Sequence, residues 1–173
     1  ELPNILKNFN TSGLMVTHDP EEAMAICDKV AVMNEGNIHQ CDEPQNLIKT
    51  PKTLFVSSFI LGNNTISTQV KKDNIKTCLG ELKIQKYSKD TKVKFISISP
   101  NCIDINKNKN GKGTIISKEF LGDFYIYKIS IGDYKLRVKT DININFSIGE
   151  KCHLNIKKDS EFFIYPGGFK NIA

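Results

Sequence analysis

The sequence predicts an α+β protein in which a short α/β segment precedes an all-β segment. Up to Gly62, apolar runs alternate with capped helical stretches, as in α/β units. Beyond Gly62, short strand candidates follow one another between turn residues, which is typical of a barrel or sandwich. The charge changes at the same point: residues 1–62 carry 4 Lys and 8 Asp or Glu, and residues 63–173 carry 20 Lys or Arg and 11 Asp or Glu.

Length and composition limit the class of protein. The 173 residues, 39% hydrophobic and 25% charged, are enough for a folded domain with a small partner and exclude disorder. The most apolar run, Leu54 to Leu61, has eight residues, whereas a spanning helix needs about twenty. We therefore expect no transmembrane segment, and no secretory signal is visible. An odd number of cysteines, five, without CxxC spacing favours a reducing, intracellular location.

The first third is expected to hold a buried strand and a capped helix. Leu2 to Phe9 resembles a helix end, and the apolar run Leu14 to Val16 predicts a strand buried on both faces. Asp19 suits an N-cap, with Pro20 at the first helical position and Glu22 three residues after the cap, as in a capping box. The helix from Pro20 to about Cys27 is expected to bury four side chains: Ala23, Met24, Ile26 and Cys27.

A hairpin and two helices are expected next. Val30 to Met33 and Ile38 to Cys41 are strand candidates, joined by a tight turn at residues 34–37. A short helix is predicted over Glu43 to Lys49, ended by Thr50-Pro51. A further helix is predicted from Lys52 to Leu61, with Gly62 at its end.

The remainder predicts short strands and no long helix. The candidates are Ile66–Val70, Ile75–Cys78, Glu81–Gln85, Lys92–Ile98, Gly113–Glu119, Tyr125–Ile131, Tyr134–Lys139, Cys152–Ile156 and Phe162–Tyr165. Asn106 to Lys112 is expected to be a mobile polar loop. Phe120, Phe124, Tyr125 and Tyr127 either form a ligand platform or fill the interior and a hairpin face. The Phe162–Tyr165 strand is expected in the core or at a dimer contact.

His18 is the candidate functional residue. It follows a predicted buried strand and precedes a capped helix, which is where open α/β sheets bind ligands. Such a histidine can bond a terminal phosphate or an attacking water, or it can be a satisfied side chain at a strand end. No metal site is expected, because His18, His39 and His153 are scattered and the neighbours Cys152 and His153 point to opposite faces of a strand.

The longer run around His18 resembles the end of an ABC-transporter ATPase domain. The resemblance lies in Val16-Thr17-His18-Asp19-Pro20-Glu21-Glu22-Ala23-Met24, in residues 28–38, in Glu43-Pro44, in residues 51–56 and in residues 59–62. It covers residues 1–62 and fits the importer branch of the family. It implies that His18 is the switch histidine that contacts the γ-phosphate of ATP, with Mg²⁺ as the accompanying ion in the full-length parent. Asp19 is then mainly a helix cap.

Residues 63–173 resemble the accessory domain called TOBE, which follows the ATPase domain in such importers. The resemblance lies in Lys94–Pro100, Gly113–Ile116, Glu119–Asp123 and the Gly149-Glu150 turn. It implies a small OB-like β-barrel that serves in dimerisation and regulation. Ser99-Pro100-Asn101 departs from the Arg-Pro-Glu usual in relatives, which puts any regulatory contact through those charges in doubt.

An ATPase also needs parts that this sequence lacks. The sequence contains no GxxxxGK[ST] phosphate loop. It also lacks the family's LSGGQ-like signature and the acidic pair that precedes the family's D-loop. We therefore expect a C-terminal fragment that is inactive alone, without a bound cofactor of its own, whose full-length parent is a transport ATPase.

The leading interpretation is a regulatory and dimerisation portion of an importer subunit. Its expected partners are a second copy, bound through the TOBE domain, and permease subunits. It is expected to be cytoplasmic and peripheral at the inner face of the membrane, without direct insertion and without nucleic acid. Ferric iron is the favoured substrate, with polyamine, sugar or anion as others. The alternative is an OB-like module that binds nucleic acid or a small oxyanion, which the basic charge favours and the single arginine, Arg137, opposes.

Overall fold

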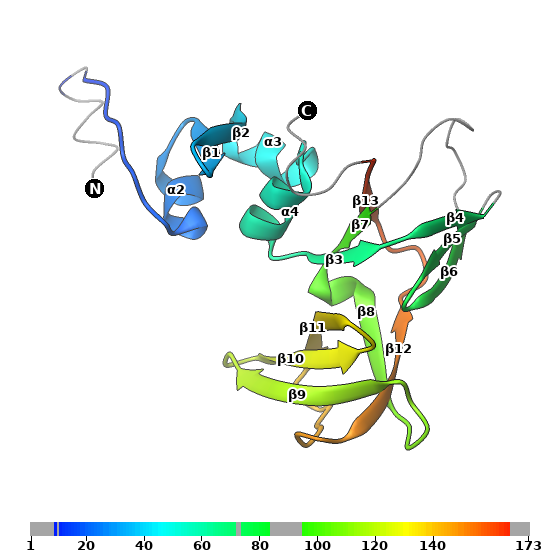
Figure 1. The fold of residues 1–173 in the computed structure, drawn as a ribbon. Coiled ribbons are helices and arrows are strands. Elements are labelled where there is room, and N and C mark those ends of the chain that lie inside the picture. The colour runs from blue at the N-terminus through cyan, green and yellow to red at the C-terminus, as the bar shows by residue number, and fades with distance from the viewer. Residues whose placement is uncertain (1–8, 10, 72–73, 84–94, 167–173) are drawn as a thin grey trace. The chain divides into compact units, whose positions relative to one another are not determined.

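The computed structural model describes residue 9 and residues 11–71, 74–83 and 95–166 (Figure 1). It divides into two compact units. Unit 1 contains the described residues up to Leu61, and unit 2 contains those from Gly62 onward. The chain is rich in strands and has few helices. The assignment of residues 1–62 and 63–173 to two named domains stays a prediction.

Unit 1 combines a helix, a hairpin and two further helices. Its elements are α2 (Pro20–Ile26), β1 (Val30–Asn34), β2 (Asn37–Asp42), α3 (Pro44–Lys49) and α4 (Leu54–Leu61). Glu35 and Gly36 at the hairpin turn both have positive φ, 48° and 77°, the geometry that matches the twist of the flanking strands. The hairpin and the three helices predicted between Pro20 and Leu61 are therefore confirmed.

The core of unit 1 is small. Val32, Leu47 and Val56 are buried together, one from β1, one from α3 and one from α4. Of the four residues expected to be buried on α2, Ala23 is buried and the other three are only half-buried. One face of α2 therefore contributes less to this core than its sequence predicts.

The expected strand at Leu14 to Val16 is wrong. Residues 11–17 have no regular structure, and Leu14 and Val16 are 96% and 92% exposed. A strand needs neighbours to bond its backbone and apolar layers to cover its side chains. Within the described ranges, no segment pairs with these residues. The helix expected over Leu2 to Phe9 lies, except for Phe9, outside the described residues.

The described part of unit 2 forms three antiparallel sheets. The first, in spatial order, contains β11 (Tyr134–Asp141), β10 (Phe124–Ile131), β9 (Gly113–Phe120), β12 (Lys151–Ile156) and β8 (Ile103–Lys107). The second contains β13 (Phe162–Tyr165), β7 (Phe95–Ile98) and β3 (Asn64–Ser67), and the third contains β4 (Gln69–Lys71), β5 (Asn74–Thr77) and β6 (Gly80–Lys83). A single hydrophobic cluster draws side chains from all three, including Ile66, Ile75 and Tyr127.

Most predicted strands of unit 2 are confirmed, with three differences. The candidate Ile66–Val70 is two strands, β3 and β4, and β8 was not predicted. Asn106 and Lys107 belong to β8, so the predicted loop starts two residues too early. Its remainder is tied down, because Asn108 N–H bonds Lys151 O at 3.3 Å and Gly111 N–H bonds Asn108 O at 2.9 Å. Residues 84–94, which carry parts of two candidates, lie outside the described ones.

Polar side chains join separate strands of unit 2. The Asn64 amide of β3 donates to Arg137 O at 2.8 Å and accepts from Arg137 N–H at 2.7 Å, so it occupies the outer edge of β11 as a neighbouring strand residue would. The Tyr127 hydroxyl donates to Ile144 O and accepts from Phe146 N–H, each at 3.1 Å. One buried phenol thus holds the segment between β11 and β12 against the sheet.

Tyr127→Phe is expected to lower the free energy of unfolding of unit 2 by about 1–3 kcal/mol, because it leaves the buried Phe146 N–H without a partner. Urea unfolding followed by tyrosine fluorescence measures this, since all five tyrosines follow residue 62 and the chain has no tryptophan. The control is Tyr125→Phe, whose hydroxyl makes no hydrogen bond within the described residues. Equal losses for both variants would contradict the role given to Tyr127.

Candidate functional site

Three side chains fix the backbone on both sides of His18. Asp19 Oδ1 accepts the N–H groups of Glu21 at 2.9 Å and Glu22 at 3.3 Å, which caps α2. The Thr17 hydroxyl donates to Glu22 Oε2 at 2.8 Å and accepts Asp19 N–H at 3.1 Å. The cap predicted from sequence is confirmed, but Glu22 reaches the cap N–H through Thr17 instead of bonding it directly.

Thr17 is the residue at this site that the sequence analysis missed. A hydroxyl two residues before an N-cap can take the cap N–H in a local turn, so Thr17-His18-Asp19 contained a usable signal. The consequence is that residues 17 and 19 are both bonded to the first turn of α2, and His18 lies between them in a bend. Among the described residues, only local hydrogen bonds position this loop.

The His18 side chain is exposed. Its ring makes no hydrogen bond to any described residue, so both ring nitrogens are accessible. The alternative of a histidine satisfied at a strand end is therefore not what the structure has, because within the described ranges no strand precedes His18 and no residue bonds its ring. An exposed imidazole on a fixed loop can donate a hydrogen bond to an anionic group brought to it.

The other two histidines have different surroundings. His39 on β2 is buried; its Nδ1 lies 3.2 Å from Thr53 Oγ1 and its ring lies 4.9 Å from that of Phe55. His153 on β12 is exposed while its neighbour Cys152 is buried, as expected for adjacent strand residues. Burial raises the pKa of the Cys152 thiol to about 11. Within the described ranges, no three His, Cys, Asp or Glu side chains lie close enough to hold a metal ion.

The aromatic residues of β9 and β10 divide between core and surface. Tyr127 is buried and packs edge-on against Phe146 with ring centroids 5.6 Å apart. Tyr125 and Phe124 lie farther out, and each is covered by an ammonium group: Lys118 Nζ is 4.0 Å from the Tyr125 ring and Lys139 Nζ is 3.7 Å from the Phe124 ring. The interior role is correct for Tyr127, and the outer rings already have cations over their faces.

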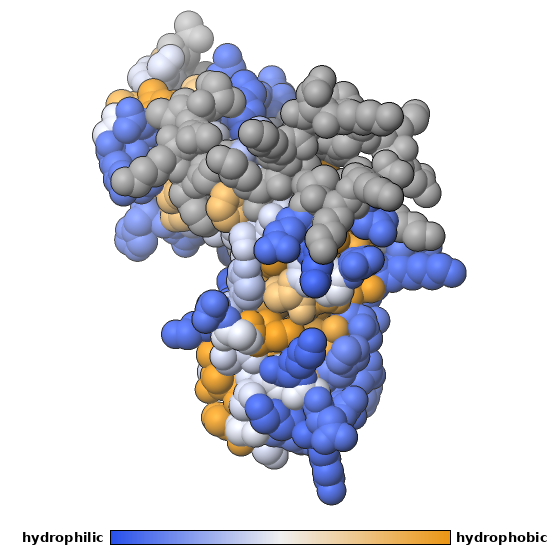
Figure 2. All heavy atoms as spheres, turned by 45° about the vertical axis from the view of Figure 1, so that its right-hand side comes forward, coloured by the Kyte–Doolittle hydropathy of each residue, from blue (hydrophilic) through white to orange (hydrophobic). Residues whose placement is uncertain are grey.

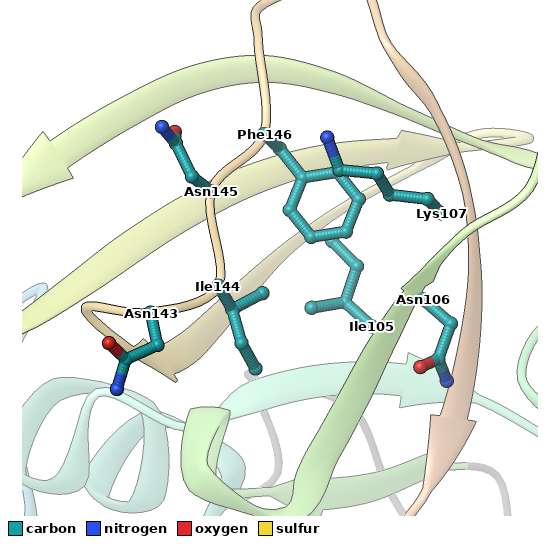
Figure 3. A pocket seen from close by; sticks show the side chains of 7 residues that line it. All are labelled: Ile105, Asn106, Lys107, Asn143, Ile144, Asn145 and Phe146. Atoms are coloured by element: carbon teal, nitrogen blue, oxygen red, sulfur yellow. The ribbon is translucent and has the colours of Figure 1, made fainter.

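Two open hollows mark the surface of unit 2. The first, of about 430 Å³, lies between β8 and the segment after β11 (Figure 3). The second, of about 500 Å³, adjoins it through Lys107. Figure 3 shows the Lys107 ammonium over the Phe146 ring, 5.4 Å from its centroid, with Asn106 directed away.

The polar groups of these hollows are largely bonded within the chain. Lys107 Nζ lies 3.1 Å from Glu150 Oε1, Lys118 Nζ donates to Asn145 Oδ1 at 2.6 Å, and Lys151 Nζ donates to Thr114 Oγ1 at 2.9 Å. A bound oxyanion would have to compete with these partners. Among the described residues, these three lysines are therefore engaged within the chain.

Sequence comparisons identify the known proteins to which this chain is similar. No family model matches the chain. The Fe(3+) ions import ATP-binding protein FbpC of Fusobacterium nucleatum is 30% identical over 182 residues, which cover 99% of this chain and 48% of that protein. The spermidine/putrescine import ATP-binding proteins PotA of Trichormus variabilis and Bacillus thuringiensis are 46% identical over 70 residues and 38% identical over 91 residues.

These alignments show what the chain is related to. It is homologous to the ATP-binding subunits of ABC importers, in their C-terminal region. The PotA alignments cover 40% and 50% of this chain and 18% and 28% of those relatives. The aligned segments therefore span less than half of the length of each of these proteins.

The surroundings of Glu150 predict how the stability of unit 2 depends on pH. Its carboxylate accepts Ser147 N–H at 2.9 Å and pairs with Lys107, and these bonds hold its pKa below the ordinary value of 4.5. A carboxyl with a lowered folded pKa stabilises the fold above its unfolded pKa, and this stabilisation is lost as the pH falls through the folded value. Unit 2 is thus expected to lose stability below about pH 4.5.

In Glu150→Gln, this acid-dependent loss is expected to be smaller. Urea midpoints at neutral and acidic pH, followed by tyrosine fluorescence, provide the measurement. Glu161→Gln is the matched control, because Glu161 is exposed and has no ion pair within the described part of the chain. The prediction fails if the two variants and the parent chain lose stability equally on acidification.

Proposed function

We propose that this chain is the C-terminal part of the ATP-binding subunit of an ABC importer, in which unit 1 ends the ATPase domain and unit 2 is an OB-like TOBE domain. The observation that carries the proposal is the exposed, unbonded His18 imidazole, fixed between an unpaired apolar segment and a capped helix. The homology to importer ATP-binding subunits supports it.

The residues present fit one part of an ATP site. His18 offers a hydrogen-bond donor on a rigid loop, which suits contact with the terminal phosphate, where negative charge accumulates during transfer. The sequence has no glycine-rich loop and no adjoining Lys and Ser or Thr to cradle the remaining phosphates and Mg²⁺. Bound MgATP supplies the phosphoanhydride bond that hydrolysis breaks. Residues 1–173 alone are therefore proposed not to hydrolyse ATP.

The roles of the residues around His18 follow from their bonds. Asp19 is a positioning residue, because its carboxylate is used by two backbone N–H groups of α2. Thr17 is the second positioning residue, since it joins the backbone before the cap to Glu22. His18 has no other partner among the described residues, so its ring can adjust to a phosphate oxygen or to an attacking water. Because the loop is already fixed, orienting His18 toward the phosphate costs little conformational entropy.

The exposed apolar residues of unit 1 support a larger ATPase domain around His18. Leu14 and Val16 are separated by two positions, so in an extended chain they lie on the same face. Strands added beside residues 14–17 would bond their backbone, and helices over that sheet would cover both side chains. His18 would then stand at the carboxyl end of a buried strand, where α/β proteins place phosphate ligands.

The transported substrate, partners and location are proposed from the relatives. FbpC, the relative matched over 99% of the chain, is named for Fe(3+) ions and PotA for spermidine and putrescine, so we propose ferric iron first and a polyamine second. Permease subunits and a second copy of this chain are the proposed partners, at the cytoplasmic face of the membrane. None of the helices in the described part of the chain has the length and apolar composition that a bilayer crossing requires.

A fusion protein tests the role of His18. It joins residues 1–173 to the portion of the Fusobacterium nucleatum relative that precedes the matched region. In this fusion, His18→Ala is expected to reduce ATP hydrolysis about 100-fold or more, because it removes a donor aimed at developing charge. ATP binding, measured separately, is expected to change little, since the rest of the phosphate site is intact.

His153→Ala is the matched control, as it removes an exposed histidine from unit 2 and should leave hydrolysis unchanged. Residues 1–173 alone, assayed with MgATP at high protein concentration, are expected to release no phosphate beyond the level of their own His18→Ala variant. Undiminished hydrolysis by the His18→Ala fusion would contradict the proposed contact.

A further inference from the structure

The connection between β8 and β9 contains the one Asn-Gly dipeptide of the sequence, Asn110-Gly111 (Figure 1). In such a dipeptide the glycine nitrogen can attack the asparagine side chain, because no Cβ shields it. The attack closes a succinimide ring, and ring closure requires the glycine nitrogen to lie on the same side of the asparagine Cα–C bond as Cβ. Whether the dipeptide reacts therefore depends on the backbone conformation of the connection.

The backbone holds this dipeptide in a conformation that cannot react. Gly111 N–H donates to Asn108 O at 2.9 Å, and neither Lys109 nor Asn110 has a positive φ, which together define a type I turn over residues 108–111. The third residue of a type I turn has a ψ of about 0°. This ψ turns the Gly111 nitrogen away from Asn110 Cβ, and the hydrogen bond to Asn108 occupies the N–H group that would have to attack.

Two contacts with β12 hold the turn in place. Asn108 N–H donates to Lys151 O at 3.3 Å, and Gly111 lies so close to the strand that a Cβ on it would overlap Cys152 O. Position 111 therefore requires glycine. Within the turn, Asn108 Oδ1 also accepts Asn110 N–H at 2.9 Å. The close contact that requires glycine after Asn110 thus also prevents the peptide between them from rotating into the reactive geometry.

Solvent and charge around the turn suit the hydrolysis of a succinimide. Asn110 is exposed, and the hollow of about 500 Å³ is lined by its neighbours Asn108 and Lys109. Figure 2 shows hydrophilic side chains projecting from much of the surface of unit 2. Lys109 and Lys112 form no ion pair within the described residues. A carboxylate formed at position 110 is therefore attracted by two uncompensated ammonium groups.

We propose that Asn110 is a deamidation site whose reaction is controlled by the attachment of the turn to β12. When the turn detaches, the Gly111 nitrogen bonds Asn110 Cγ, and the side-chain nitrogen leaves as ammonia together with the proton of the Gly111 N–H. Water then opens the ring at either carbonyl, which gives aspartate or isoaspartate. Each conversion consumes one water and releases one ammonia, and no other reactant is needed.

The two products differ in whether the turn can attach again. Aspartate keeps the main chain as it was and places its carboxylate between two lysines. Isoaspartate routes the main chain through the side chain and adds a CH₂ group between positions 110 and 111. Gly111 then cannot both bond Asn108 O and lie against the Cys152 backbone. A chain that has formed isoaspartate is therefore less stable in unit 2, and this consequence is independent of the role of His18 and of transport.

Incubation of residues 1–173 at mildly alkaline pH, with and without an unfolding concentration of urea, tests the proposal. Peptide mass spectrometry measures the conversion of Asn110, and methylation by a protein isoaspartyl methyltransferase counts isoaspartate. We expect conversion to be at least about tenfold slower in the folded chain, because it requires local opening of the turn. Asn108→Ala removes the side-chain bond to Asn110 N–H, and we expect it to raise the folded-state rate at least about threefold.

Asn106→Ala is the matched control, because Asn106 is an exposed asparagine of β8 whose side chain makes no hydrogen bond within the described residues. It should leave the rate at Asn110 unchanged, and tyrosine fluorescence checks that both variants fold. Equal rates in the folded and unfolded chain, or equal folded-state rates for the two variants, overturn control by the turn. An Asn110 that stays intact in the unfolded chain overturns the site itself.

The isoaspartyl product provides a second measurement. After removal of urea, chains with isoaspartate at position 110 are expected to unfold at a lower urea concentration than the Asn110→Asp variant, which carries the same charge on an unaltered main chain. Equal urea midpoints for the two would show that the turn accepts the longer main chain. That result would overturn the inference that the contact between Gly111 and Cys152 fixes the turn.

Discussion

The backbone groups of residues 14–17 have no strand beside them in the described part of the chain, and the role of His18 depends on this. Leu14 and Val16 expose nearly their whole side chains, while the next residues are bound tightly by the α2 cap. The backbone groups of this exposed segment can bond water, but its apolar side chains are unfavourable in water. We propose that other polypeptide completes a sheet beside this segment, and that His18 then lies where that polypeptide would present a phosphate.

Hydrogen bonds from side chains to backbone groups also hold the strands and loops of unit 2 together. The Tyr127 phenol serves two backbone groups of the segment before β12, and the Asn64 amide serves two at Arg137. In this way side chains close the β11 edge and hold an irregular segment over the core.

Sequence patterns predicted correctly those features that depend on interactions between residues close together in the chain. The cap at Asp19, the Glu35-Gly36 turn and the alternating strands β10 and β11 each depend on residues close in the chain, and each was predicted. The strand at Leu14 to Val16 failed because a buried strand is defined by its neighbours, which the pattern of three apolar residues does not reveal. β8 was missed because Asn106 and Lys107 resemble loop residues, although Ile103 and Ile105 alternate into the core. His18 was identified by resemblance, and the Thr17 bond that helps to fix its loop required coordinates.

Amide hydrogen exchange at residues 15–17 tests the central claim most directly. It is measured in residues 1–173 alone and in the fusion that adds the preceding part of the Fusobacterium nucleatum relative. If this segment is the unpaired margin of an ATPase sheet, its amides exchange almost without protection in the chain alone and become strongly protected in the fusion. Equal exchange in the two proteins would show that residues 14–17 need no further strands, and would contradict the account of His18.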